Sequence, residues 1–283
     1  MTAETLSVQA RARPGRRATG TLLALGWTEA RRMLTSPAYA VLLVFILLSS
    51  GATAFTGDVS TWLPTKPEAY DLLRYLLVLY AGLATYLVAH LVSSSARRSD
   101  AEVQLSAAPA GERSRTLGLV MGLVMGPVAV AAILLAVVAW LGSQPAVVAA
   151  GLQPFSGAQL VQVALMVLGG GVFGVMIATW LRFPGSLLLG LFALVFATGW
   201  LGGDSAAYAA WLPLLVPFVT AADWFDAVVL TSAVHVWHAV YLLGLCGLGT
   251  VAAALHDPGR RLPWVGYGAV VLAVTVAAAV AQS

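Results

Sequence analysis

Residues 116–141 read TLGLVMGLVMGPVAVAAILLAVVAWL and contain no charged side chain. A helix needs about 20 consecutive apolar residues to cross the hydrocarbon core of a bilayer, and this stretch is long enough. A membrane β-strand would instead alternate apolar and polar residues. A helix bonds its backbone polar groups within the segment, as lipid requires, so a transmembrane helix is the structure that this stretch predicts.

Apolar runs of the same kind lie on both sides of this stretch. Of the 283 residues, 60% are hydrophobic and 10% are charged, whereas about a quarter are charged in typical soluble domains. We therefore predict an all-α polytopic membrane protein with six core spans, an inner turn from residue 256 and a seventh span at 264–281. The core spans are expected at residues 38–56, 72–95, 116–141, 159–181, 186–201 and 231–255.

Three segments outside the spans differ from them in composition. Residues 1–19 are basic and polar, which predicts a disordered cytoplasmic arm. Between residues 202 and 230, prolines and aspartates interrupt apolar clusters, which predicts short re-entrant helices in the outer leaflet. Residues 20–36 are amphipathic, which predicts a helix lying in the cytoplasmic interface, with Trp27 at headgroup depth. Its apolar side would carry Leu22, Leu23, Trp27, Ala30, Met33 and Leu34, and its polar side Glu29, Arg31 and Arg32.

The basic residues are unevenly divided between the predicted loops. If successive loops alternate sides, 13 of the 15 Lys and Arg residues fall on one side, and only Lys66 and Arg74 fall on the other. Short loops rich in Lys and Arg stay in the cytoplasm. The distribution therefore predicts a multi-pass protein of the cell membrane, with a cytoplasmic N-terminus and an extracytoplasmic C-terminus.

Three stretches follow one another in a recognisable order: WTEARRMLTSP at 27–37, RRSDAEVQLSAAPAGERSRTLG at 97–118, and WLPLLVPF at 211–218. Their combination resembles the membrane subunit of a type-2 ATP-binding-cassette (ABC) exporter over residues 20–255. Two features depart from that family. The seventh span lies beyond the six-span core, and Gln104, Leu105 and Ser106 stand where bulkier apolar pairs are common.

The resemblance implies a permease that works with a separate cytoplasmic ABC ATPase subunit and with a second permease copy or paralogue. It also implies that the charged loop at 97–115 docks on the ATPase. Interleaved charges of both signs suit a mixed-charge partner surface, although the same charges could simply be solvated and set the topology. The expected docking residues are Arg97, Arg98, Asp100, Glu102, Pro109, Glu112, Arg113 and Arg115.

The chain has no recognisable ATP site of its own. A phosphate-binding loop needs Gly-x4-Gly-Lys-Ser/Thr, and the only lysine, Lys66, follows Leu-Pro-Thr. Gly169, Gly171 and Gly174 match Gly-x-Gly-x-x-Gly, but they lie in an apolar span without a preceding strand. We therefore expect no enzyme activity and no cofactor in this chain, with ATP and Mg²⁺ on the partner, and no nucleic-acid binding.

A few residues within the spans remain as candidates. Gly118, Gly122 and Gly126 recur every four residues and predict close helix packing, either within the subunit or across a dimer. His235 and His238 are spaced to share a helix face, yet no further ligand accompanies them, so no metal site is expected. His90, near the inner end of its span, is expected to be a helix-packing or membrane-interface residue.

The spans carry almost no fixed charge, which favours an amphipathic or hydrophobic substrate. The alternative is a non-transporting assembly or regulatory protein that has a permease-like fold.

Overall fold

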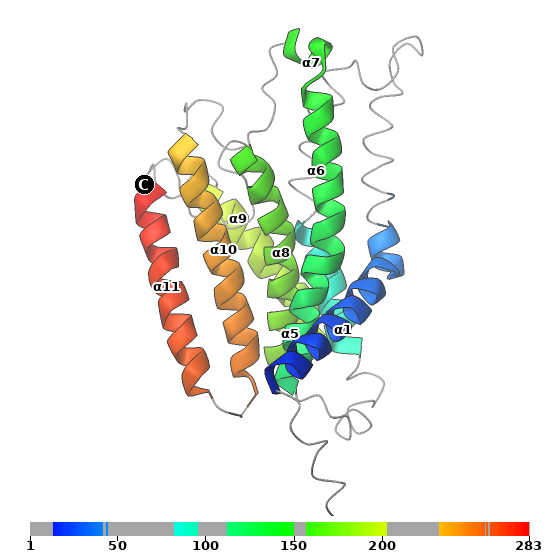
Figure 1. Cartoon of the computed structure of the whole chain (residues 1–283), viewed down its shortest axis with the longest axis vertical. Coiled ribbons are helices and arrows are strands. Elements are labelled where there is room, and N and C mark those ends of the chain that lie inside the picture. The colour runs from blue at the N-terminus through cyan, green and yellow to red at the C-terminus, as the bar shows by residue number, and fades with distance from the viewer. Residues whose placement is uncertain are drawn as a thin grey trace, which may run out of the picture.

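The computed structural model describes residues 14–41, 44, 82–95, 112–149, 157–202, 232–257, 259 and 261–282. All regular structure in these residues is helical, as the apolar runs predict (Figure 1). Residues 37–41 and 82–95 are helical. The named elements are α1 (Pro14–Leu34), α5 (Glu112–Leu123), the π-helix η4 (Val124–Val128), α6 (Ala129–Gly142), α7 (Pro145–Ala149), α8 (Gly157–Trp180), α9 (Ser186–Gly202), α10 (Ser232–Leu255) and α11 (Leu262–Gln282).

Four stretches of the described residues are long and apolar enough to cross a membrane. These are Arg113–Trp140, Leu160–Trp180, Val234–Leu255 and Leu262–Gln282. By length and composition they are the helices of a membrane-embedded protein, and α6, α8, α10 and α11 run side by side in Figure 1. Most of the predicted span 38–56 and the re-entrant segment 203–230 lie outside the described residues. The full number of spans therefore stays a prediction.

Two helices begin earlier than the sequence predicts. Helix α1 begins at Pro14 rather than Gly20, so residues 14–19 of the predicted disordered arm are helical. Proline suits the first position of a helix, because the amide it lacks would have no partner there. Helix α5 begins at Glu112 rather than Thr116, which places Arg113 and Arg115 in its first turn and not in the loop.

The third predicted span is one continuous helical rod with a local irregularity. Pro127 lies within the π-helical segment Val124–Val128, between α5 and α6. Proline lacks an amide hydrogen and its ring crowds the carbonyl four residues earlier, and a wider π turn accommodates both defects. The short helix α7 follows this rod and lies between the predicted spans 116–141 and 159–181.

Helix α8 is the centre of the bundle. Half of the most apolar segment of α8 is buried, whereas only 11% of the most apolar segment of α11 is buried. One core cluster joins α8 to α6 and α10 through Leu135, Val138, Val163, Met166 and Leu242. A second cluster joins α8 to α1, to residues 82–95 and to the end of α5, and includes Met33, Val88, Leu123, Val172 and Val175.

The glycine-rich stretch of α8 is a packing surface for residues 82–95. A Cβ built at Gly170 would collide with the backbone of Gly82, and one built at Gly174 would lie 2.5 Å from the carbonyl oxygen of Tyr86. Small residues allow helices to approach this closely in membranes. Two of the three glycines in the Gly-x-Gly-x-x-Gly match serve helix contact: Gly174 lies against Tyr86, and Gly171 lies against the side chains of Leu123 and Thr85.

Candidate functional site: the two ends of the charged loop

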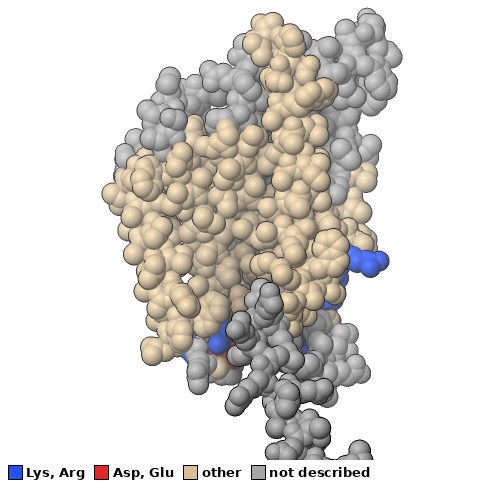
Figure 2. Space-filling model, in the orientation of Figure 1, with Lys and Arg blue, Asp and Glu red and all other residues tan. Residues whose placement is uncertain are grey.

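The predicted docking loop is described only where it ends. Arg97, Arg98, Asp100, Glu102 and Pro109 lie outside the described residues. On the N-terminal side the described helical residues extend to Ser95, and on the C-terminal side α5 begins at Glu112. Figure 2 shows that the charged side chains visible among the described residues of this face lie in its lower half, and that the described residues of its upper part show none.

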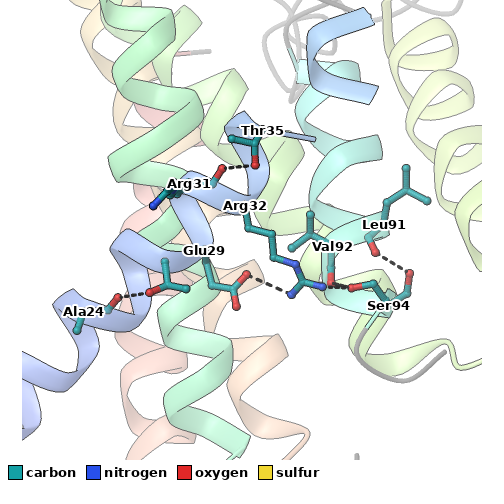
Figure 3. Close-up of polar contacts among 10 residues, drawn as sticks. Ala24, Glu29, Arg31, Arg32, Thr35, Leu91, Val92 and Ser94 are labelled. Atoms are coloured by element: carbon teal, nitrogen blue, oxygen red, sulfur yellow. Dashed lines mark hydrogen bonds and ion pairs between the residues drawn. The ribbon is translucent and has the colours of Figure 1, made fainter. Parts of the chain in front are cut away.

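The N-terminal end of the loop is attached to α1. The Arg32 guanidinium donates a hydrogen bond from Nη2 to the hydroxyl of Ser95, which in turn donates to the carbonyl of Val92 at 2.7 Å. In Figure 3, Arg32 reaches from α1 toward the helix that contains Val92, whereas Arg31 points away from it. The last helical turn before the loop is therefore attached to the amphipathic helix.

Glu29 lies beside this contact and is the charged residue of α1 that burial affects most. Its Oε2 atom is 3.7 Å from Nη1 of Arg32, and its side chain is largely buried. Burial raises the pKa of the Glu29 carboxyl, and the neighbouring Arg32 only partly offsets that rise. Arg31 and Arg32 remain exposed on the polar side of the helix, as the sequence predicts.

The C-terminal end of the loop is attached to the turn between α10 and α11. The backbone amide of Arg113 donates to Oδ2 of Asp257 at 3.3 Å, and its Nη2 donates to the Asp257 carbonyl at 3.4 Å. Nε of Arg113 is 4.0 Å from the same carboxylate, and the guanidinium carbon lies 5.6 Å from the Trp264 ring centre. Arg113 thus contacts this chain, although the sequence assigned it to a partner surface.

Asp257 is held in place by its own turn as well as by Arg113. The amide of Gly259 donates to Oδ1 of Asp257 at 2.8 Å. This bond is the largest influence and lowers the pKa of the Asp257 carboxyl. Burial opposes it, and the positive charges of Arg113 and Arg261 lower the pKa further. An aspartate before Pro-Gly is a turn signal, but no sequence pattern links it to an arginine so far away in the chain.

Gly118, Gly122 and Gly126 form a glycine stripe along α5 and η4, and α1 packs against this stripe. A Cβ built at Gly118 would lie 3.0 Å from Cβ of Leu25, and one at Gly122 would lie 2.8 Å from Cβ of Glu29 and 3.0 Å from the Ala30 amide nitrogen. At Gly126 the nearest atom would be Cα of Ala30, at 3.2 Å. These three glycines therefore serve contact within the subunit.

The buried face of α1 differs from the predicted apolar face. Ala30 and Met33 are buried as expected, but Leu23 is 43% and Trp27 65% exposed. Two small residues, Gly26 and Ala30, take inner positions, where they allow α1 to approach α5 and η4 closely. The bulky side chains of Leu23 and Trp27 face outward, where they can contact lipid.

The two histidines of α10 have separate surroundings. Nδ1 of His238 is 3.0 Å from Oε1 of Gln282 on α11, and both side chains are buried. The backbone carbonyl of His235 accepts a bond from Gln162 of α8 at 2.8 Å. Among the residues that the structure describes, no group of three His, Cys, Asp or Glu side chains is placed to hold a metal ion.

Comparison of the chain with protein-family models, with curated proteins and with solved structures gave no match in any of the three. Any assignment of function therefore depends on the residues and contacts described above.

Proposed function

We propose that this chain is the membrane-spanning permease subunit of an ATP-driven exporter of the type-2 ABC class, located in the cell membrane. It moves an amphipathic or hydrophobic substrate with energy from a separate ABC ATPase, and it pairs with a second permease subunit. The observation that carries the proposal is the attachment of both ends of the 97–115 segment to helices that lie elsewhere in the chain.

A coupling element has to transmit movement from a partner into the membrane bundle. Movement of the loop would pull on α1 through the Arg32–Ser95 bond at one end. At the other end it would pull on the α10–α11 turn through Arg113 and Asp257. A loop that served only to set topology would not need either attachment.

Helix α1 supplies the second part of this mechanism. It crosses α5 obliquely in Figure 1 and is packed against the stripe of Gly118, Gly122 and Gly126. When the partner ATPase closes around bound ATP, α1 and α5 would therefore move together as one unit. Such rigid-body movement of packed helices is a common way to switch a bundle between two accessible states.

The test is whether the loop couples a partner's ATP hydrolysis to this chain. The full-length chain is purified in mild detergent with its ABC ATPase, and ATP hydrolysis is measured with and without the chain. Arg98→Glu and Glu102→Arg should abolish the effect of the chain on hydrolysis and weaken co-purification. Lys66→Glu, a charge reversal on the predicted outer side, is the matched control and should change neither quantity.

Two outcomes would contradict the proposal. One is a purified complex that contains no nucleotide-hydrolysing subunit, which would favour the non-transporting alternative. The other is coupling that the loop reversals leave unchanged while the chain stays in the membrane.

A further inference from the structure

A cavity of about 360 Å³ opens where residues 82–95, the end of α8 and the start of α9 meet. It lies at the end of the bundle that holds Arg113, Arg182 and the α10–α11 turn, which we call the basic end. This volume is in the range of small-ligand sites. The cavity is lined by His90, Leu91, Ser94, Ala178, Leu181, Arg182, Phe183, Pro184, Ser186 and Leu187.

The polar wall of the cavity is built from side chains that favour an anion. His90 and Ser186 are both buried, and Nε2 of His90 is 3.0 Å from the Ser186 hydroxyl. The exposed guanidinium of Arg182 lies 3.1 Å from Nε2 of His256, which holds it at the rim. Among the residues that the structure describes, none that lines the cavity is acidic. Arginine with hydroxyl donors is the chemistry that binds phosphate oxygens.

The other wall is apolar and continues into the membrane. The side chains of Leu91, Leu181 and Phe183 form this wall, and Leu187 extends the wall to the start of α9. From there Leu188, Phe192 and Phe196 follow at every fourth residue, with exposed fractions of 69%, 66% and 57%. Residues spaced by four lie on one face of a helix, so an exposed apolar strip begins beside the cavity. A free phosphate ion would make no use of that strip, whereas an acyl chain would.

We propose that this cavity binds the phosphate headgroup of an anionic membrane lipid. Arg182 and the hydroxyls of Ser94 and Ser186 contact the phosphate, and the acyl chains lie along the exposed face of α9. Basic pockets between membrane helices are suited to such headgroups. The site does not depend on the transport function, because it uses residues outside the charged loop.

The experiment measures lipid retention by native mass spectrometry on the purified full-length chain. The probes are phosphatidylglycerol, phosphatidylcholine with the same acyl chains, and inorganic phosphate. We expect one phosphatidylglycerol to be retained about tenfold more tightly than phosphatidylcholine, and Arg182→Gln to remove that preference. Arg261→Gln removes the same charge from the same end without touching the cavity and should preserve it.

Two further variants separate binding from structural damage. Leu187→Trp fills the cavity while keeping Arg182 and should also abolish retention. His256→Ala removes the contact that holds Arg182 but leaves the cavity residues in place, and most of the retention should survive.

The proposal is overturned if Arg182→Gln and Leu187→Trp both retain phosphatidylglycerol like the unmodified chain. It is equally overturned if inorganic phosphate displaces the lipid, because the ligand would then be a free phosphate.

Discussion

Helices α1 and α11 both lie at the edge of the bundle, yet they are attached in different ways. Helix α1 packs against glycines of α5 and η4, and its own backbone is among the atoms nearest to them. At Gly122, for example, the Ala30 amide nitrogen of α1 is one of the nearest atoms. Helix α11 packs against glycines of α10 through side chains. Thr275 of α11 contacts Gly244, and Val271 of α11 contacts Gly247. A side chain can move or be shortened by mutation, whereas a backbone cannot. The contact of α1 should therefore be the less tolerant of the two.

The surfaces that the two helices leave exposed also differ. Leu262, Val270 and Val280 of α11 are 82%, 65% and 68% exposed, and the helix carries no charged residue. Helix α1 instead exposes Trp27 next to Arg31 and Arg32. An all-apolar exposed face suits surrounding lipid, and a mixed face suits the membrane–water interface. We therefore expect α11 to contact lipid and α1 to lie at the membrane–water interface.

The largest effect is expected for Gly122→Leu. The new side chain has no space between α5 and the α1 backbone, so α1 should detach at a cost of about 3 kcal/mol. Trypsin cleavage after Arg31 and Arg32 reports the detachment, because both arginines are exposed but protected within a packed helix. The control is Gly20→Leu, where a Cβ meets nothing within 4 Å. Equal cleavage in the two variants would show that the stripe does not hold α1.

Gly244→Ala should have a smaller and reversible effect of about 1–2 kcal/mol. Its Cβ would collide with the Thr275 hydroxyl. Adding Thr275→Ala removes that hydroxyl, so the double variant should recover most of the lost thermal stability in detergent. The corresponding pair Gly122→Ala with Glu29→Ala should not recover, since the Cβ at position 29, which alanine keeps, and the Ala30 amide both remain. Rescue of both pairs would contradict the distinction between backbone and side-chain contact.

Asp257→Asn tests the polar attachment at the basic end. It removes the charge that Arg113 contacts while keeping the size of the side chain, and the expected cost is about 0.5–1 kcal/mol because the pair is partly exposed. Hydrogen exchange at the start of α5 and of α11 should increase together. Faster exchange at only one of the two helices would show that Asp257 does not connect them.

The smallest effect is a pH dependence with opposite signs in the two regions. The pKa of Glu29 is raised, so its contribution to α1 packing is present below the ordinary value of 4.5 and is lost as the pH rises through the raised value. The pKa of Asp257 is lowered, so its contribution is present above the ordinary value of 3.8 and is lost as the pH falls through the lowered value.

Hydrogen exchange measured between pH 3 and 7 distinguishes the two signs after correction for intrinsic rates. Glu29→Gln should remove the dependence in α1 and leave that of the α10–α11 turn unchanged. A dependence in α1 that persists in Glu29→Gln would mean that another group titrates there.

The apolar runs were sufficient to predict helices and several of their bounds. The predicted span 159–181 corresponds to α8, 186–201 to α9, 231–255 to α10 and 264–281 to α11, each within a few residues. Long runs without charge have one stable backbone structure in lipid, so local composition is enough. Helix ends were less predictable, because charged residues such as Arg113 and Arg115 read as loop residues in the sequence although they lie in the first turn of α5.

The candidate site was predictable only in part. Charge pattern located the basic segments, but the attachments of the loop depend on Ser95 and Asp257, which no motif distinguishes. Likewise the spacing of Gly118, Gly122 and Gly126 predicted a close contact without naming the helix that makes it. Contacts between residues more than 60 positions apart depend on how helices pack, and a single sequence does not contain that information in its local pattern.

The sequence by itself determined that this chain is helical and apolar, that its charges gather in particular segments, and that a small-residue stripe follows one helix. These properties come from the length, period and composition of each segment. The tertiary structure alone decided that α1 fills the stripe, that Arg113 contacts Asp257, and that Arg182, His90 and Ser186 share one cavity. The reason is physical: apolar helices attract one another with little directional preference, and shape complementarity between backbones selects the partner.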